Sequence, residues 1–239
     1  MKNYYQEIVQ AKSDNRKLIA ILLDPDKIVL NNLPTLIEKI QLSPATHVFV
    51  GGSSVSNQIM DTLIQRLKEK VTLPIILFPG NPSQISEHAD AILFLSLISG
   101  RNSDYLIDHQ VNAVPILKKT ALEVISTGYI LIESGSETAV EQVSKTKPLS
   151  RNNCDYVCQT AVAGTYLGNK LIYLEAGSGA KLAVPLEMIR KVTAAISVPL
   201  LVGGGIRSHK EIQEAFDHGA DLVVIGTAFE NNPNFFNHD

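Results

Sequence analysis

Short apolar runs rich in β-branched residues recur along the chain, and longer segments with helical spacing separate them. The runs lie at Lys17–Leu23, His47–Gly51, Pro74–Phe78, Ala91–Leu97, Tyr129–Glu133, Leu171–Glu175, Pro199–Val202 and Asp221–Ile225. Each run is almost continuously apolar, which is typical of parallel strands that are covered on both faces. The pattern therefore predicts eight parallel strands.

The segments between these runs carry helix signals. Asn57–Lys70 repeats apolar residues every three or four positions, and Pro185–Ile196 begins with proline, which is favoured at a helix start. Ser208 is a predicted N-cap, and Glu211 three residues later completes a predicted capping box. Another helix is expected to begin at residue 152 or 153 and to run to about Leu167.

Eight strand–helix units in 239 residues predict one closed α/β barrel, a (β/α)8 TIM barrel that forms a single domain over residues 1–239. An open, doubly wound sheet is the alternative. The link Asn81–His88 is too short for a barrel helix, which takes about ten residues or more. The barrel is therefore expected to be modified, with its third helix missing or reduced. Two interpretations remain open: a simple shortening, or a gap through which a long apolar ligand leaves the barrel.

Composition narrows the class of protein further. The chain is 45% hydrophobic and 19% charged with a formal net charge of −3, so no basic field suggests nucleic acid as a partner. No apolar run approaches the roughly 20 residues of a transmembrane segment, and the N-terminus lacks a signal-peptide core. A soluble cytoplasmic protein is expected. Cys154 and Cys158 share a predicted helix face and are interpreted as reduced thiols that pack against it.

Barrel active sites lie at the carboxyl ends of the strands, where this sequence places polar and glycine-rich turns. Asp24 follows the first strand, and Gly51–Ser53 follows the second. A carboxylate near serine hydroxyls and phosphate oxygens suits Mg²⁺, although Asp24 in an Asp-Pro pair is also a common loop cap. Ser134–Arg151 is long and polar and follows the fifth strand, so it is interpreted as an active-site loop.

Glycines follow the sixth, seventh and eighth strands in the same relative position. Their backbone N–H groups can approach phosphate oxygens closely, and the loops after the last two strands form the usual phosphate site of such barrels. This pattern predicts the class of ligand, a phosphorylated small molecule, but not the reaction.

Tyr173 and Glu175 lie two residues apart on the sixth strand and therefore share a face. A buried glutamate in an apolar strand needs a partner or a role, and general base is the natural role. Glu133 is a second candidate. No lysine, cysteine or histidine stands at the carboxyl end of a predicted strand, so carboxylates, a metal and phosphate binding are left to carry the chemistry.

Several of these segments resemble one known family, the geranylgeranylglyceryl phosphate synthases. The most specific segment is Tyr173-Leu174-Glu175-Ala176-Gly177-Ser178-Gly179-Ala180. The other matching segments are Leu23–Asp26, Val50–Ser53, Val202–Arg207 and Ile225–Thr227, so the resemblance spans nearly the whole chain.

The resemblance implies a barrel that lacks a regular third helix and a prenyltransferase of ether phospholipid biosynthesis. Such an enzyme joins the 3-hydroxyl of sn-glycerol 1-phosphate to geranylgeranyl diphosphate and uses Mg²⁺. It further implies a homo-oligomer, metal binding by Asp24 and Ser53, and proton abstraction by Glu175. The implied glycerol 1-phosphate ligands are Tyr173, Leu174, Glu175, Ala176, Gly177, Ser178, Gly179, Gly204, Gly205, Gly226 and Thr227.

One departure concerns the donor. Some bacterial members carry lysine two residues before the metal aspartate, where this chain has Leu22, and they use a longer prenyl chain. The intact YLEAGSG run favours the geranylgeranyl donor here. The competing interpretations are a phosphosugar isomerase or cyclase, a flavin-binding barrel, and a phosphate-binding barrel without catalysis.

Overall fold

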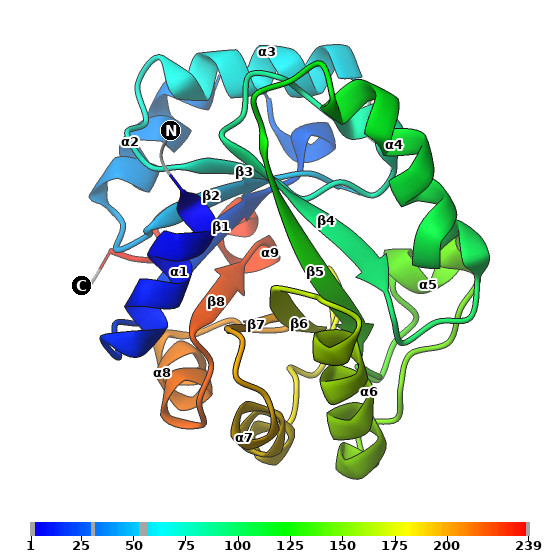
Figure 1. Cartoon of the computed structure of the whole chain (residues 1–239). Coiled ribbons are helices and arrows are strands. Elements are labelled where there is room, and N and C mark those ends of the chain that lie inside the picture. Colours follow the sequence, from blue (N-terminus) through cyan, green and yellow to red (C-terminus); the bar gives the residue numbers. More distant parts are fainter. Residues whose placement is uncertain (1–2, 30–31, 53–56, 238–239) are drawn as a thin grey trace.

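The computed structural model describes residues 3–29, 32–52 and 57–237, and in it eight parallel strands close into a barrel (Figure 1). The strands follow one another around the barrel in chain order, and β8 pairs with β1. Their bounds are β1 (Leu18–Leu23), β2 (His47–Val50), β3 (Ile75–Leu77), β4 (Ala91–Leu97), β5 (Glu123–Leu131), β6 (Leu171–Glu175), β7 (Leu200–Gly203) and β8 (Leu222–Ile225). This closure confirms the predicted barrel and excludes the open sheet.

All eight strands lie where the apolar runs predict them, but β5 begins six residues earlier than expected. It pairs with β4 from Ala91↔Glu123 to Leu97↔Tyr129. The first half of β5, Glu123–Gly128, mixes polar and apolar residues and therefore lacks the continuous apolar signal. Ser126 in this half instead donates to the side chain of Asn169 at 3.0 Å.

Helices surround the barrel (Figure 1). Their bounds are α1 (Tyr4–Ser13), α2 (Leu33–Leu42), α3 (Asn57–Lys68), α4 (His109–Leu117), α5 (Ala139–Ser144), α6 (Cys154–Tyr166), α7 (Leu186–Ala195), α8 (His209–Asp217) and α9 (Thr227–Asn231). Short turns of other helix types are η1 (Pro25–Lys27), η3 (Pro82–Gln84) and η4 (Asp104–Asp108), and η4 runs directly into α4. The link between β3 and β4 holds only η3, so the prediction of a reduced third helix is confirmed.

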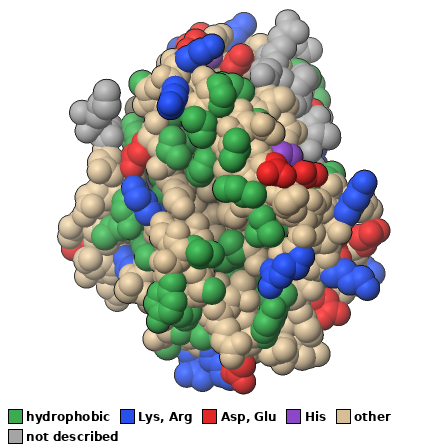
Figure 2. All heavy atoms as spheres, turned by 45° about the vertical axis from the view of Figure 1, so that its right-hand side comes forward, with side chains coloured by type: hydrophobic (Ala, Val, Ile, Leu, Met, Phe, Trp, Pro, Cys, Tyr) green, Lys and Arg blue, Asp and Glu red, His purple; other side chains and the backbone are tan. Residues whose placement is uncertain are grey.

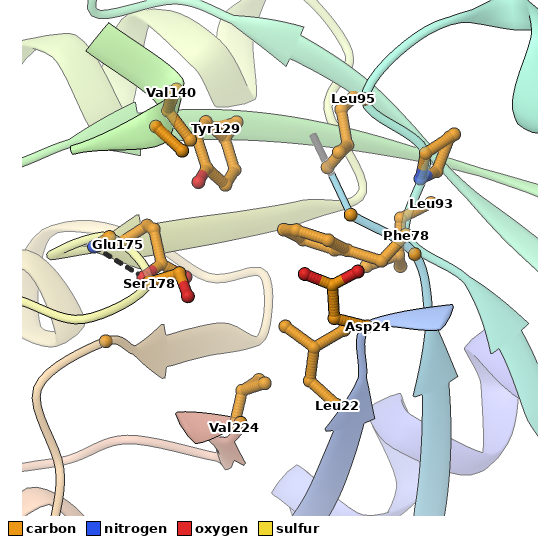
Figure 3. Close-up of a pocket in the computed structure, with 18 of the residues that line it drawn as sticks. Leu22, Asp24, Phe78, Leu93, Leu95, Tyr129, Val140, Glu175, Ser178 and Val224 are labelled. Carbon is orange, nitrogen blue, oxygen red and sulfur yellow. Dashed lines mark hydrogen bonds between the residues drawn. The ribbon is translucent and has the colours of Figure 1, made fainter. Parts of the chain in front are cut away.

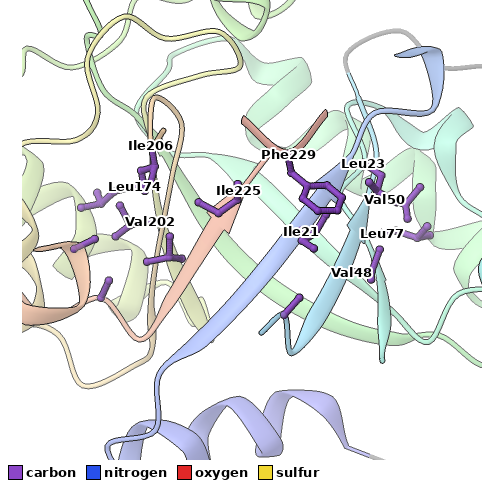
Figure 4. Close-up of a cluster of buried hydrophobic side chains, with 14 of the residues drawn as sticks. Ile21, Leu23, Val48, Val50, Leu77, Leu174, Val202, Ile206, Ile225 and Phe229 are labelled. Atoms are coloured by element: carbon purple, nitrogen blue, oxygen red, sulfur yellow. The ribbon is translucent and has the colours of Figure 1, made fainter. Parts of the chain in front are cut away.

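Apolar side chains form an inner and an outer core. The inner one fills the barrel, where Phe49, Tyr129 and Tyr173 are buried, and α1 adds Ile8 and Ala11 to it. The outer one lies between the strands and the helices and includes Ile21, Val202 and Phe229 (Figure 4). Alternation along each strand divides its residues between the two cores. The inner face of a strand therefore ends at the barrel mouth, where the candidate site lies.

Two local predictions need correction. Ser134–Arg151, predicted as an active-site loop, does reach the cavity at the barrel mouth through Val140 and Val143, but it contains a helix, α5, which begins with a true capping box between Thr138 and Glu141. Ser208 caps α8 as predicted, but the carboxylate of Glu211 accepts the backbone N–H of Arg207 at 2.7 Å instead of that of Ser208.

The cysteine prediction is confirmed by the packing of α6. Both thiols are free and half-buried, and the Sγ of Cys158 lies 3.6 Å from the carbonyl oxygen of Lys191 on α7. The N-cap of α6 is Asn153, one of the two predicted starts.

Candidate active site

A cavity of about 680 Å³ opens at the carboxyl ends of the strands. It has a polar part around Asp24, Glu175 and Ser178, and an apolar part around Phe78, Leu95 and other side chains (Figure 3). The polar part is bordered by β1, β6 and the loops after β7 and β8. A pocket of this size with few charged groups is typical of a small-molecule site.

Asp24 directly follows β1, and its carboxylate points into the cavity (Figure 3). Its side chain is about one-fifth exposed, and one of its oxygens accepts the backbone N–H of Asp26 at 3.2 Å. The interpretation of Asp24 as a loop cap is therefore confirmed. The same carboxylate also packs against Gly52, because a Cβ there would stand 2.5 Å from Oδ1. Asp24 thus belongs both to the η1 turn and to the cavity wall.

Lys27 is a cavity residue that the sequence analysis missed. Its Nζ lies 3.3 Å from Asp24 Oδ2 and 3.0 Å from Glu230 Oε2, and it approaches Ser178 Oγ at 3.5 Å. Glu230 in turn accepts the backbone N–H of Asp24 at 3.0 Å. Burial lowers the pKa of Lys27, but Glu230 and Asp24 outweigh it, so the net shift is upward and the lysine stays charged. The polar part therefore contains a fixed cation beside a carboxylate.

Glu175 stands at the end of β6 with a carboxylate that is buried at the bottom of the polar part. Its Oε1 accepts the backbone N–H of Gly177 at 2.6 Å, the dashed contact in Figure 3. Burial raises its pKa above the ordinary value of 4.5, while the Tyr173 hydroxyl and the Gly177 N–H lower it in part. A buried carboxylate with a raised pKa and an open side towards a cavity is suited to general-base catalysis.

Tyr173 lies on the same face of β6, as predicted. Its ring is fully buried between Phe78 and Tyr129. Its hydroxyl lies close enough to Glu175 to lower the pKa of that carboxylate. Among the described residues, however, no hydrogen bond of acceptable geometry involves this hydroxyl. Both groups press against Gly203, where a Cβ would stand 2.4 Å from the tyrosine oxygen. A polar ligand atom reaching this point would satisfy that hydroxyl.

Glycine is required at position 204 by two independent facts. Its φ is +80°, which side chains rarely adopt, and a Cβ there would stand 2.3 Å from Glu175 Oε1 and 2.6 Å from the Gly177 nitrogen. Gly226 is different, because its φ is negative and a Cβ would meet only Leu22, at 3.7 Å. Gly204 therefore allows the backbone to approach Glu175, whereas Gly226 leaves free room on the cavity side.

The loop after β6 is held in place by Arg207, which follows the glycines of β7. Its guanidinium donates to the carbonyl oxygens of Ala180 at 2.6 Å and Lys181 at 3.3 Å. At the tip of the same loop, Ser178 Oγ lies 3.4 Å from Thr227 Oγ1 at the start of α9. The loops after β6, β7 and β8 therefore meet around one small polar space, as the glycine pattern predicts.

The apolar part extends away from Glu175 towards the reduced third helix. It begins at Phe78, Leu93, Leu95, Tyr129 and Val140 (Figure 3). It continues between the β3–β4 link, which contributes Pro82 and Ile85, and α4, which contributes His109, Gln110 and Ala113. The two parts form one continuous cavity. This arrangement favours a ligand exit over a simple shortening as the interpretation of the short link.

The structure separates the residues that the resemblance implies into three groups. Those that line the cavity are Asp24, Tyr173, Glu175, Gly177, Ser178, Gly179, Gly204, Gly205, Gly226 and Thr227. Leu174 and Ala176 are buried and belong to the outer core, so their side chains lie away from the cavity. Ser53 lies outside the described residues. The second base candidate, Glu133, is exposed and absent from the cavity lining, and its carboxylate accepts a hydrogen bond from Ser150 Oγ at 3.4 Å.

Comparisons with known proteins bear on this site. The chain matches the PcrB family over residues 12–238. It is 64% identical over 232 residues to the geranylgeranylglyceryl phosphate synthase of Flavobacterium johnsoniae, covering 97% of this chain and 96% of that one. The corresponding enzyme of Zunongwangia profunda is 47% identical over 231 residues, with 97% and 98% covered.

A solved structure of an enzyme with the same name as these two relatives has the same fold as this chain. The (S)-3-O-geranylgeranylglyceryl phosphate synthase of Thermoplasma acidophilum, in complex with sn-glycerol-1-phosphate, superimposes with a TM-score of 0.92 at 31% identity. The match covers 99% of this chain and 95% of that one.

The barrel, its cavity and these relatives together define an enzyme of the prenyltransferase class. The chain belongs to the PcrB family, that of the geranylgeranylglyceryl phosphate synthases. No helix among the described residues is long and apolar enough to cross a membrane.

Proposed function

We propose that this enzyme joins the 3-hydroxyl of sn-glycerol 1-phosphate to the first carbon of geranylgeranyl diphosphate. The carbon–oxygen bond to the diphosphate breaks, an ether bond forms, and diphosphate leaves with the bonding electron pair. The hydroxyl proton passes to the enzyme. The product is the first ether of an ether phospholipid. The observation that carries this proposal is that the polar part of the cavity, with Glu175, and the apolar part, hereafter the apolar groove, form one continuous cavity.

The polar part suits glycerol 1-phosphate. Backbone N–H groups of glycine-rich loops, the hydroxyls of Ser178 and Thr227, and the cation Lys27 surround the space where a phosphate would bind. The binding set comprises Tyr173, Glu175, Gly177, Ser178, Gly179, Gly204, Gly205, Gly226 and Thr227, with Leu174 and Ala176 contributing backbone. Support comes from the Thermoplasma acidophilum enzyme, which was solved with this substrate.

Glu175 is proposed to take the proton of the glycerol 3-hydroxyl. Its buried carboxylate keeps one oxygen on the Gly177 N–H and leaves the other, Oε2, towards the cavity. The Tyr173 hydroxyl has hydrogen-bonding capacity left for the same substrate. Holding the hydroxyl beside the allylic carbon of the donor provides much of the rate through proximity.

Mg²⁺ is the proposed cofactor, and the residues present fit it. Asp24 offers one carboxylate on the cavity wall, and no group of three or more His, Cys, Asp or Glu gathers among the described residues. That sparse set suits Mg²⁺, which uses one or two carboxylates, waters and substrate phosphates. When bound, the ion would neutralise the diphosphate and make it a better leaving group. Ser53, the second proposed ligand, lies outside the described residues.

The apolar groove is proposed to hold the prenyl chain. Phe78, Leu93 and Leu95 line its beginning, and its far end lies between the short β3–β4 link and α4. A phosphosugar isomerase or cyclase would use the same phosphate-binding turns but has no need of such a groove. This difference favours the prenyltransferase over that alternative.

The experiment that tests the proposal is incubation of the purified chain with glycerol 1-phosphate, Mg²⁺ and prenyl diphosphates of several lengths. Mass spectrometry of the extracted lipid identifies the ether product. We expect geranylgeranylglyceryl phosphate as the main product, with farnesyl and longer donors used less well. Absence of an ether product with every donor, from a folded sample, would contradict the proposal.

A further inference from the structure

Three charged side chains meet at the edge of the polar part of the cavity. The ammonium nitrogen of Lys27 lies 3.3 Å from Asp24 Oδ2 and 3.0 Å from Glu230 Oε2, so two carboxylates share one cation. Figure 2 shows one outer face of the molecule, where charged side chains lie around and between hydrophobic ones. The Lys27 cluster differs from such surface charges, because its three members line the cavity. With two negative charges and one positive, the cluster attracts a further cation.

Glu230 is the fixed member of this cluster. Its side chain is only 10% exposed, and both carboxylate oxygens are used: Oε1 accepts the backbone N–H of Asp24 at 3.0 Å, and Oε2 accepts from Lys27. It stands on α9, the helix that begins directly after Gly226. Its own backbone N–H donates to the carbonyl oxygen of Gly226 at 3.0 Å. Glu230 therefore ties the lysine to the helix that borders the proposed phosphate space.

Lys27 is the member that can change partners. Its side chain is 46% exposed, and an ammonium group has three donors. Besides the two carboxylates, Nζ approaches Ser178 Oγ at 3.5 Å, and Ser178 lies 3.4 Å from Thr227 Oγ1. The ammonium thus stands between Asp24, the proposed metal ligand, and the proposed phosphate space. A small movement would take it from one to the other while it stays bound to Glu230.

In the arrangement that the structure shows, the ammonium competes with a metal ion for Asp24. Nζ contacts Oδ2, one of the two oxygens that a divalent cation would use, and two cations at one carboxylate repel each other. A phosphate monoester carries about −1.5 to −2 charges at neutral pH, more than a carboxylate. Bound beside Ser178, it would therefore draw the ammonium away from Asp24.

We propose that Lys27 is a counterion switch, which pairs with Asp24 until a phosphate monoester binds beside Ser178 and then moves to that phosphate. Glu230 is the positioning residue that retains the lysine in both arrangements. Glycerol 1-phosphate and the metal ion therefore bind cooperatively. By linkage, each raises the affinity for the other by the same factor, typically about 5–150-fold. The switch rests on the proposed function for the identity of the two ligands, but it does not depend on ether formation.

The switch gives the reaction an order. Lys27 keeps Asp24 neutralised until the acceptor hydroxyl of glycerol 1-phosphate is in place. An allylic carbon that lost its diphosphate without an acceptor would react with water, and protection of reactive groups from hydrolysis is a general function of enzyme sites. The coupling therefore protects the prenyl donor.

The test is the binding of Mn²⁺, which shares the preference of Mg²⁺ for oxygen ligands. Electron paramagnetic resonance measures the free Mn²⁺ while the full chain is titrated, alone and with saturating sn-glycerol 1-phosphate, and no prenyl donor is present. We expect the wild type to bind Mn²⁺ at least about fivefold more tightly with glycerol 1-phosphate. Asp24→Asn should lose this binding, which ties the signal to the cluster.

Two variants separate the switch from simple charge. Lys27→Met should bind Mn²⁺ more tightly than wild type without phosphate, and saturating glycerol 1-phosphate should then add little. Lys27→Met/Glu230→Gln removes one charge of each sign, so its Mn²⁺ affinity without phosphate should return towards wild type while the coupling stays absent. Lys181→Met, at an exposed lysine after β6, should behave as wild type. Circular dichroism melting checks that each variant is folded.

Several outcomes would overturn the switch. Coupling that Lys27→Met retains in full would show that the charge of the phosphate acts without the lysine. Mn²⁺ binding that glycerol 1-phosphate leaves unchanged in wild type, that Asp24→Asn retains, or that is absent under both conditions would overturn it as well. A wild type that shows the coupling but forms no ether from any prenyl donor would instead reject the proposed reaction and support the switch.

Discussion

The carboxylate of Glu175 leaves no room for a side chain at Gly204, because a Cβ at position 204 would stand 2.3 Å from Oε1. The close approach brings the end of β6 beside the residue that follows β7, and both residues line the polar part of the cavity. A buried glutamate at the end of β6 therefore requires glycine in the loop after β7.

Gly204→Ala and Gly226→Ala should therefore differ. At position 204, an added methyl group meets backbone and Glu175 at a φ of +80°, so we expect a melting temperature lower by several degrees and a strong loss of kcat. At position 226, the methyl group fits the fold but takes space from the phosphate. We expect normal melting and a raised KM for glycerol 1-phosphate. If Gly226→Ala leaves that KM unchanged, the phosphate binds elsewhere.

Asp24→Asn should lower activity by orders of magnitude and leave the fold intact. The amide keeps the turn contact with Asp26 but loses the charge that Mg²⁺ requires. Activity should rise with added Mg²⁺ in the wild type and vanish in excess chelator. Calorimetric titration with Mg²⁺ and the donor checks binding directly. Full activity in chelator would refute the metal's role.

Lys27→Met tests the role of the lysine that the structure places in the polar part of the cavity. Removing it leaves Asp24 and Glu230 without their shared partner and takes one positive charge from the polar part. We expect weaker binding of a phosphorylated substrate, roughly tenfold or more in KM, from the loss of a charge-assisted contact. Lys181→Met serves as the matched control, because that lysine is exposed. Equal kinetics for the two variants would remove Lys27 from the site.

Much of the fold could be predicted from the sequence because buried parallel strands are continuous apolar runs. The first half of β5 could not be predicted in this way, because Ser126 and Thr127 interrupt its apolar run. The helix α5 was missed although Thr138 and Glu141 form a readable capping-box pair. That signal lay inside a segment interpreted as a loop because of its polarity.

For the site, the strand-end position of Asp24 and the spacing of Tyr173 and Glu175 were enough to find them. Lys27 and Glu230 were missed because their partnership spans 203 residues of sequence. Only the closure of β8 against β1 brings them together. The sequence neighbours of Lys27 alone, an Asp-Pro-Asp turn, suggest a solvated side chain.

The pH dependence of stability follows from the raised pKa of Glu175. Because the folded state favours the protonated form, the fold binds more protons than the unfolded chain between pH 4.5 and the raised value. The contribution of Glu175 to stability is therefore greatest below pH 4.5 and is lost as the pH rises through its folded-state pKa. Glu175→Gln should remove this loss, so the variant should melt at the same or a higher temperature than wild type at neutral pH. A clearly lower melting temperature would mean that the carboxylate is structural.

The most direct test of the account is kcat for ether formation by wild type, Glu175→Gln and the control Glu133→Gln on one set of saturating substrates. Loss of the base at an otherwise unchanged site should lower kcat about 10²–10⁴-fold in Glu175→Gln. Both substrates should still bind, and Glu133→Gln should match wild type because that side chain is exposed. A kcat for Glu175→Gln within about threefold of wild type, well short of the loss expected for a missing base, would contradict the account.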